Sequence, residues 1–435
     1  MIKKSETKKE NGERTYISDL KEGKEYFLEG WCHELRDLAK IKFILLRDVS
    51  GIVQCIIKNE KLFKKFSELT LESVISLKGL AKKADVKSSE VSLHNIEVEI
   101  LDLDLINKAE RLPIQIVEKG VTTGFDLRLD YRFLDFHKRK IQAIFRIQTE
   151  IANAFRKYFY DKGFMEIQAP GIISAASEGG TELFPVQYFE KKAYLAQSPQ
   201  LYKQMLACSI EKTFTIAPVW RAEKHNTTRH INEIRQMDIE VAFTNQIQIM
   251  NELGGCVKFI VKQILENCKQ ELEILNVKLK IPNAVYLSYE DAIKKVSGKI
   301  GEDFTPEQEK KLCDLYPGDI VFTHSWPSEL KPFYIMPRGE NKDAKVSEGF
   351  DALYGGLEIS SGGQRVHLPE LLVERIKMKG LNPINFKSYI DSFRYGAPPH
   401  SGWSIGLERI TQIICGLDNV KEATMFPRDR DRLTP

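Results

Sequence analysis

The hydrophobic pattern of the chain changes its period near residue 138. Between residues 16 and 105, apolar and polar positions alternate in short runs, as in "EYFLEGWCHEL", "KFILLRDVSGIVQCII", "ESVISLKGLAKKA" and "VSLHNIEVEIL". Such alternation, interrupted by glycine and other turn formers, is typical of β-strands. Residues 16–105 therefore predict a small antiparallel β-barrel.

The pattern on either side of the barrel predicts two less regular segments. Residues 1–15 are charged and predict a flexible N-terminus, and residues 106–130 lose periodicity and predict a hinge.

Beyond the hinge, apolar residues recur at helical spacing and predict one face of a long helix that ends at "DKGF". They are Ile141, Ile144, Phe145, Ile147, Ile151, Phe155 and Phe159. Strand-like and helical segments, including a helix over 251–275, then alternate. Residues 131–435 thus predict a second, α+β domain, in which an insert at about 277–345 gives little signal.

Composition narrows the class of protein. Lys and Arg total 64 against 61 for Asp and Glu, so any surface for nucleic acid must be local. The seven cysteines are scattered and none forms CxxC, which argues against disulfides and thiolate zinc sites and fits a reducing cytoplasm. No apolar run approaches the length of a membrane span, and no HxxH or HExxH spacing suggests zinc catalysis.

The stretch "RAEKHNTTRH" follows the strand-like "FTIAPVW" and precedes "INEIRQMDIEVAF", which predicts a cationic loop between two neighbouring antiparallel strands. Arg221 offers a rigid fork for two oxyanion oxygens, and Glu223 can accept from an amine. Arg229 and His230 can reach a terminal phosphate. The alternative is an ordinary solvated basic turn.

Two further stretches have weak signals when taken alone. In "GWSIGLERI", Arg409 lies at the start of a helical segment, where a guanidinium can stack on a purine and pair with phosphate. Gly406 would let a ligand approach the backbone. The other stretch is the long helix with the following "GFMEIQAPGI". A surface arginine and a purely structural helix are the alternatives.

Together and in this order, the three segments resemble the three signature motifs of class II aminoacyl-tRNA synthetases. "LAQSPQLYKQML", "LEISSGGQRVH", "FRYGAPPHSGWSIGLER" and "FPRDRDRLTP" are similar to the class IIb subgroup, in particular to archaeal and eukaryotic-type aspartyl-tRNA synthetases, over roughly residues 16–435. The resemblance implies that 16–105 form an OB-fold that binds the anticodon. It implies that 131–435 form an antiparallel sheet of six or seven strands flanked by helices. It also implies a cytoplasmic homodimer joined through the first motif.

The resemblance implies an aspartate-binding pocket formed by Glu178, Ser198, Gln200, Lys203, Arg221, Asp238, Ser361 and Arg365. Glu178, on a mobile loop, and Asp238 would hold the ammonium group. Lys203 and Arg365 would grip the side-chain carboxylate. Two cations can distinguish aspartate from asparagine, because a buried cation pair facing a neutral amide is costly.

The resemblance also implies an ATP-binding site, which is formed by Arg221, Glu223, Arg229, His230, Ile231, Glu358, Ser361, Gly406, Glu408 and Arg409. Arg221 would bind the α-phosphate, and Arg409 would cover one adenine face. Glu358, helped by Ser361, would hold Mg²⁺ with hard oxygen ligands. Arg221, Glu358 and Arg409 are thus the predicted catalytic residues. The implied reaction activates L-aspartate to aspartyl-adenylate and transfers it to the 3′ end of tRNA(Asp) through positioning and electrostatics.

In the barrel, "RDLAKIKFILLRDVSGIVQ" is similar to the anticodon-reading surface of the family. Phe43 would stack on a base, Arg36 would contact base or phosphate, and Gln54 would read a base edge. A core position is the alternative for Phe43. His33 stands where members that also charge tRNA(Asn) tend to carry histidine, whereas the proline usual at a second position is not evident in "KKADVKSSE". The two signals oppose each other, so charging of tRNA(Asn) stays open.

The chain departs from the family pattern at two places. Ile234 stands where an aromatic usually lies beneath adenine, so Ile234 or Arg235 would contact the base. Residues 325–327 read "SWP" where an acid, an aromatic and proline are common. Both departures bear on the fit of the pocket.

Three rival functions make different predictions. An asparaginyl-tRNA synthetase would carry a denser arginine run after "RAEK", where this chain has "HNTTRH". A non-catalytic RNA-binding paralogue would have broken ATP motifs, and a related asparagine synthetase would lack the barrel. The sequence favours the aspartate enzyme over all three.

Overall fold

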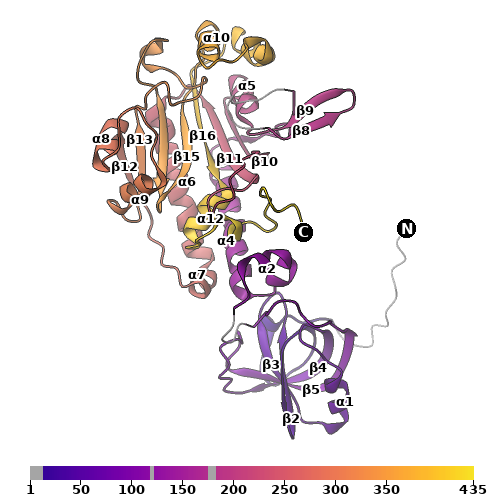
Figure 1. Cartoon of the computed structure of the whole chain (residues 1–435). Coiled ribbons are helices and arrows are strands. Elements are labelled where there is room, and N and C mark those ends of the chain that lie inside the picture. Colours follow the sequence, from indigo (N-terminus) through magenta and orange to yellow (C-terminus); the bar gives the residue numbers. More distant parts are fainter. Residues whose placement is uncertain (1–12, 118–121, 175–182) are drawn as a thin grey trace. The chain divides into compact units, whose positions relative to one another are not determined.

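A computed structural model describes residues 13–117, 122–174 and 183–435, which divide into two compact units after Lys138 (Figure 1). The first unit contains a closed barrel in the strand order β1-β2-β3-β5-β4. Its strands are β1 (Glu25–Leu38), β2 (Ile41–Arg47), β3 (Ile52–Ile57), β4 (Val74–Lys83) and β5 (Ile96–Asn107). The predicted barrel is confirmed, but β3 and β5 pair in parallel, which the long connection through α1 (Phe63–Ser67) and β4 allows.

A buried ionic network fixes the end of this unit to its barrel. Arg47 donates from Nη2 to Glu72 Oε2 over 2.7 Å and from Nη1 to the His137 carbonyl over 3.0 Å. The His137 Nδ1 lies 2.6 Å from the same carboxylate. Burial acts to raise the pKa of Glu72, but the hydrogen bonds from His137, His33 and Arg47 hold it well below its usual range. Because Glu72 stays charged, the network is an ionic anchor.

The predicted hinge is only partly irregular. Its last residues form α2 (Phe125–Asp130), and α3 (Arg132–Asp135) follows. Arg132 and Asp135 form a fully buried ion pair, with 2.7 Å between Nη1 and Oδ2. Short helices of this kind lack a recognisable period in the sequence, because four to six residues are too few to show one.

The second unit is built on an eight-stranded sheet in the order β12-β13-β14-β15-β16-β11-β10-β6. Its strands are β6 (Met165–Glu166), β10 (Lys212–Trp220), β11 (Glu233–Ala242), β12 (Ala284–Ser288), β13 (Ile320–His324), β14 (Gly349–Tyr354), β15 (Leu357–Gln364) and β16 (His400–Gly406). The expected antiparallel sheet of six or seven strands is confirmed in its centre, where six strands pair antiparallel in the order β13-β14-β15-β16-β11-β10. The strands β12 and β6 extend it at the two edges. The edge pairs β12·β13 and β6·β10 are parallel, since each is joined by a long crossover. The segment 277–345 thus adds strands to the main sheet.

The long helix predicted from the period is α4 (Arg139–Tyr160), which packs against α6 (Gln246–Asn267). The helix predicted over 251–275 is two helices, because α6 ends at Asn267 and α7 (Lys269–Leu275) begins after Cys268. The Phe155 ring of α4 lies 6.2 Å from that of Trp403 on β16. Neighbouring side chains on a strand point to opposite faces, so Ser404 faces away from α4. On that side α5 (Gln200–Ile210) packs over β10 and β11.

The remaining elements surround the sheet (Figure 1). They are the small sheet of β7 (Ile172–Ile173), β9 (Lys191–Leu195) and β8 (Pro185–Tyr188), and the helices α8 (Tyr289–Lys295), α9 (Pro306–Asp314), α10 (Pro369–Met378), α11 (Lys387–Arg394) and α12 (Leu407–Ile414). None of the helices in the described ranges has the length and apolar content to cross a lipid bilayer.

The seven cysteines are all free thiols. Six are buried, and Cys208 is partly buried. Burial raises the pKa of the Cys208 thiol to about 12, with a further contribution from Glu240. The thiols therefore stay protonated at neutral pH and are poor nucleophiles.

Candidate active site

A cavity of about 280 Å³ opens on the sheet face that α5 covers. Its walls come from the β10–β11 loop, β11, β15, β16 and the start of α12. The cavity brings together all ten residues predicted for ATP: Arg221, Glu223, Arg229, His230, Ile231, Glu358, Ser361, Gly406, Glu408 and Arg409. Segments far apart in the sequence therefore meet at one place, as the motifs predict.

Three buried polar atoms of this cavity have no hydrogen-bond partner among the described residues. They are Arg221 Nε, Gln236 Oε1 and Ser360 Oγ. The backbone of Arg221 is fixed, because its N–H donates to the Asn232 carbonyl over 2.9 Å. A buried donor without an acceptor is costly. The geometry therefore favours a polar ligand that accepts from the Arg221 guanidinium.

The β10–β11 loop carries the other cationic groups. Arg229 donates from Nη1 to Glu309 Oε2 of α9 over 3.1 Å, and His230 Nε2 lies 3.7 Å from Glu223 Oε2. Burial raises the pKa of Glu309, although Arg229 and Arg409 act in the opposite direction. Glu309 could not be predicted from the sequence, since the segment around α9 has no recognised motif.

The β16–α12 junction forms the opposite side of the cavity. Arg409 donates from Nη1 to the Glu358 carbonyl over 2.6 Å. The Glu408 carboxylate accepts from the Arg235 backbone N–H at 3.1 and 3.0 Å, and burial raises its pKa to about 7. Of the two residues considered for contact with adenine, Ile234 lines the cavity, whereas the Arg235 side chain pairs with Glu233.

An acidic pair lies beside the expected magnesium position. Burial raises the pKa of Glu358, and the nearby charge of Asp351 raises it further. Asp351, which the sequence reasoning missed, is the cross-strand partner of Ser361, and Lys331 Nζ donates to both of its oxygens at 2.6 and 2.5 Å. Within residues 13–117, 122–174 and 183–435, no three His, Cys, Asp or Glu side chains gather as a metal site. Two carboxylates and a hydroxyl suit a Mg²⁺ ion that also takes phosphate oxygens and water.

The departure at 325–327 does not reach the cavity. Trp326 is buried, and its Nε1 donates to the Thr323 carbonyl over 2.9 Å. The Lys331 ammonium lies 4.0 Å from the centre of the Trp326 ring. Trp326 therefore packs against Lys331 and does not line the cavity.

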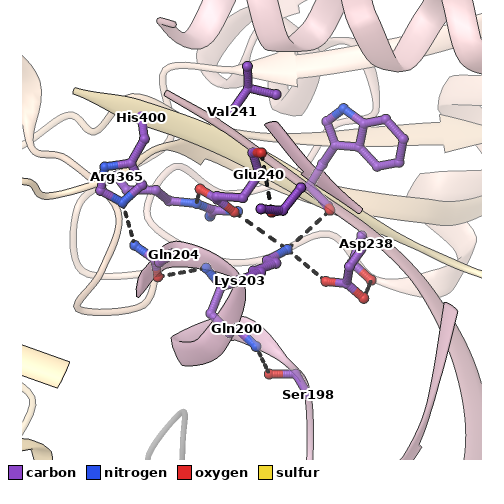
Figure 2. A network of polar contacts seen from close by, with 12 residues as sticks. Ser198, Gln200, Lys203, Gln204, Asp238, Glu240, Val241, Arg365 and His400 are labelled. Atoms are coloured by element: carbon purple, nitrogen blue, oxygen red, sulfur yellow. Dashed lines mark hydrogen bonds and ion pairs between the residues drawn. The ribbon is translucent and has the colours of Figure 1, made fainter. Parts of the chain in front are cut away.

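The floor of the cavity contains four alternating charges (Figure 2). Lys203 Nζ lies 2.6 Å from Asp238 Oδ1 and 3.6 Å from Glu240 Oε2. Arg365 forms a bidentate pair with Glu240, at 2.8 Å from Nε and 3.2 Å from Nη2. Ser198, Gln200, Asp238 and Arg365 line the cavity as predicted, whereas Lys203 is buried beneath it. Glu178 falls outside the described residues.

Among the four charges of the cavity floor, Glu240 is the one that the sequence reasoning missed. It is fully buried, and although burial acts to raise its pKa, Arg365 and Lys203 hold it below the usual range. Gly402 makes room for it, because a Cβ there would lie 2.1 Å from Glu240 Oε2. Strand alternation could have placed Glu240 on the face of Asp238, but it could not have named its partners.

A neutral hydrogen-bond chain orients Gln200 (Figure 2). Burial lowers the pKa of His400 to about 4. Its Nδ1 lies 2.8 Å from the Pro398 carbonyl, which requires the proton there, so Nε2 accepts from Gln204 Nε2 over 3.0 Å. Gln204 Oε1 then accepts from Gln200 Nε2 over 2.8 Å. This chain of hydrogen bonds leaves the side-chain oxygen of Gln200 available to accept a hydrogen bond from a ligand, such as an ammonium group.

A second cavity, of about 590 Å³, lies on the barrel. Arg36, Phe43 and Gln54 line it together with residues 85–90. Phe43 is only half-buried, so it is not a core residue. His33 is buried, and its Nε2 lies 3.4 Å from Glu90 Oε2 on the cavity wall. Three of the four residues predicted for the anticodon thus share one cavity, and the fourth supports it from beneath.

Comparison with protein families gives two matches along the chain. Residues 26–101 match the family "OB-fold nucleic acid binding domain", and residues 124–430 match "tRNA synthetases class II (D, K and N)". Curated relatives named aspartate–tRNA(Asp/Asn) ligase include one from Methanocaldococcus jannaschii, 43% identical over 97% of this chain and 98% of its own length. Another, from Archaeoglobus fulgidus, is 42% identical over 97% and 100%.

The chain belongs to the aspartate–tRNA ligase family of class II aminoacyl-tRNA synthetases. Solved structures agree with this class II fold. An aspartyl-tRNA synthetase from Entamoeba histolytica is 31% identical, with a TM-score of 0.88 over 97% of this chain and 93% of its own. The asparaginyl-tRNA synthetase from Pyrococcus horikoshii, complexed with asparaginyl-adenylate, is 30% identical, with a TM-score of 0.90 over 97% and 100%. The fold alone therefore does not separate the aspartate and asparagine branches of the class II synthetases.

Proposed function

We propose that this class II synthetase activates L-aspartate with ATP and transfers the aspartyl group to the 3′ end of tRNA(Asp) and tRNA(Asn). The chemistry rests on one observation above all, the buried and unpaired Arg221 Nε at the cavity that the ATP motifs share. The choice of aspartate rests on the relatives, several of which are named aspartate–tRNA(Asp/Asn) ligases and match nearly the whole chain.

In the first step, the α-carboxylate of aspartate attacks the α-phosphorus, and the bond to pyrophosphate breaks. Arg221 donates to the α-phosphate oxygens as their charge develops, which lowers the barrier without a covalent enzyme intermediate. Arg229 and His230 bind the terminal phosphate. Glu223 accepts from the adenine amino group, and the ring lies between Ile234 and Arg409.

Magnesium would be held by Glu358, Ser361 and Asp351. It would neutralise phosphate charge while Glu358, whose pKa is raised by burial, gains a cation that favours its ionised form. Arg409 holds the Glu358 backbone through its carbonyl. These residues therefore fix one wall against which the triphosphate is oriented.

Aspartate is selected by the charges on the floor. Lys203 and Arg365 are already compensated by Asp238 and Glu240, so the four charges sum to zero. The ammonium group of the substrate adds a cation beside Asp238 and the Gln200 carbonyl. Arg365 Nη1 can then donate to the side-chain carboxylate of the substrate, since Nε and Nη2 already donate to Glu240. The amide oxygen of asparagine could still accept from this donor, but the amide carries no negative charge to pair with the guanidinium.

In the second step, the tRNA 3′-hydroxyl attacks the aspartyl carbonyl, and AMP leaves. A neighbouring cavity of about 580 Å³ shares Glu223 with the ATP cavity and is lined by Trp220, Lys224 and Arg430, among other residues. An aromatic side chain with cations beside it suits a nucleotide with its phosphate. We assign this cavity to the tRNA acceptor end.

The barrel cavity is assigned to the anticodon, with Phe43 as the stacking platform. Base–aromatic stacking is worth about 1–3 kcal/mol per base. Phe43→Ala should therefore raise the KM for tRNA about tenfold or more and leave ATP–pyrophosphate exchange unchanged, as measured on one enzyme preparation. An unchanged tRNA KM would remove Phe43 from the anticodon site.

Aminoacylation with radiolabelled aspartate tests the tRNA assignment. Separate unmodified transcripts of tRNA(Asp) and tRNA(Asn) should both be charged at comparable rates, as expected for a relative of the aspartate–tRNA(Asp/Asn) ligases. His33 is buried and shapes the wall of the barrel cavity through Glu90. Charging of the aspartate transcript alone would show a discriminating enzyme. Labelled asparagine is the control, and its attachment would move the chain to the asparaginyl branch.

We further propose that the protein is a cytoplasmic homodimer. Apolar side chains at the end of the first motif are exposed in the single chain, with Tyr160 at 75% and Met165 at 56%. Exposed apolar surface of this kind marks interfaces. Light scattering after gel filtration should give twice the mass of one chain at micromolar concentration, and the mass of a single chain would contradict the dimer.

A further inference from the structure

The β10–β11 loop is held from the C-terminal end of the chain. Its residues 221–232 have no helix or strand, and residues 224–228 are exposed. The Asn232 N–H donates to the Arg428 carbonyl over 2.7 Å, and the Val420 N–H donates to the Thr228 carbonyl over 2.9 Å. Arg430 Nη1 donates to the Lys224 carbonyl over 3.1 Å. Residues distant in sequence therefore tie down both ends and the tip of this loop.

The side chain of Lys421 is the centre of these contacts. Its Nζ donates to Asn226 Oδ1 over 2.7 Å and lies 2.5 Å from Asp429 Oδ2. Asn226 Nδ2 donates in turn to Asp431 Oδ2 over 2.6 Å. The Lys421 side chain is 10% exposed and that of Asp429 is 3% exposed. One buried ammonium thus joins the exposed tip of the loop to the C-terminal tail.

The tail is itself ordered around the same ion pair. Asp429 Oδ1 accepts from the backbone N–H groups of Asp431 and Arg432, at 2.8 and 2.9 Å. Burial acts to raise the pKa of Asp429, but the hydrogen bond from Lys421 holds it below its ordinary value. Charged Asp429 therefore orients Lys421 toward Asn226.

The contacts of Lys421 matter because the loop carries Arg221 at one end and Arg229 near the other. On the cavity side, the loop is held by the Arg229–Glu309 pair. This contact would have to compete with a phosphate for the same guanidinium. Lys421 and Asp429 do not line the cavity, so they can hold the loop without contacting the nucleotide.

We propose that Lys421 is a positioning residue for ATP: through Asn226 and Asp429 it clasps the phosphate-binding loop to the C-terminal tail. The inference rests on the proposed role of that loop in binding ATP. Without the clasp, the loop would adopt several conformations, of which only one binds ATP. The apparent affinity for ATP then falls in proportion to the fraction of molecules whose loop is in that conformation.

The test compares Lys421→Met, Lys421→Arg and Asn226→Ala in ATP–pyrophosphate exchange. Lys421→Met should raise the KM for ATP about tenfold, while kcat and the KM for aspartate stay within about twofold of wild type. Lys421→Arg should restore most of the affinity, since it keeps the cation. Asn226→Ala changes an exposed residue and should reproduce the effect even where Lys421→Met folds poorly. Lys280→Met, which removes the exposed ion pair with Asp319, is the matched control.

A second readout does not depend on catalysis. Trypsin should cleave after Lys224 or Arg229 about tenfold faster in Lys421→Met, because cleavage of a folded chain tracks local opening. An unchanged ATP KM and unchanged cleavage in both Lys421→Met and Asn226→Ala would overturn the clasp. If Arg221→Ala also kept full exchange activity, the role of the loop in ATP binding would fail as well, so the two failures can be told apart.

Discussion

Replacement of Arg221 by alanine is expected to reduce ATP–pyrophosphate exchange by about 10³-fold or more, in the range measured for cations that stabilise phosphoryl transfer. The Arg221 Nε is buried at the cavity without an acceptor among the described residues, and its backbone is fixed by Asn232. Its donors are therefore preorganised for charge that develops during the reaction. Exchange needs no tRNA, so the assay isolates the first step.

Two matched variants sharpen this experiment. Arg221→Lys keeps the charge but loses the fork, and it should remain at least about a hundredfold below wild type. Arg394→Ala removes an exposed arginine of α11 and should have wild-type activity. Substantial exchange by Arg221→Ala would exclude the assigned role of Arg221 and with it the proposed orientation of the triphosphate.

Replacement of Glu240 by glutamine is expected to lower the free energy of unfolding of the catalytic unit by about 3–5 kcal/mol. Glu240 is fully buried and compensates both Arg365 and Lys203. Glutamine keeps the size of the side chain and part of its hydrogen bonding. It leaves one buried positive charge without a partner, which is the costly step. Urea unfolding followed by tryptophan fluorescence measures the change.

An exposed acid provides the control for this measurement. Glu290→Gln, on the surface of α8, removes a loose pair with Lys294 and should change the free energy of unfolding by less than about 0.5 kcal/mol. Equal stabilities for Glu240→Gln and Glu290→Gln would mean that Lys203 and Arg365 do not depend on Glu240. The account of the cavity floor would then be wrong.

The parts of the structure that the sequence predicted well share a physical cause. A barrel strand repeats its pattern every two residues and α4 every turn, so their periods are visible without knowledge of neighbours. The β10–β11 pair could also be predicted, because the connection between the two strands is short, and its register places Trp220 opposite Glu233. The ATP residues gathered as predicted because each motif lies at the end of a strand of the same sheet.

The parts that the sequence missed depend on contacts between distant segments. Nothing in the local pattern around residue 309 or 421 indicates that these side chains contact the β10–β11 loop. Glu240 alternates with Asp238, but its partners come from α5 and from the end of β15, which only the fold brings together. The placement of Lys203 beneath the cavity has the same origin. The parallel edge strands were missed because strand order depends on crossovers that leave no local signal.

The free cysteines give the molecule a practical property. Its native thiols are shielded or held protonated and therefore react slowly. A single thiol at an exposed position of the β10–β11 loop, as in His225→Cys, would react with a maleimide dye far faster than any native thiol. The loop can thus carry one fluorophore in an otherwise unlabelled chain. Its movement could then be followed in real time as nucleotide enters and leaves.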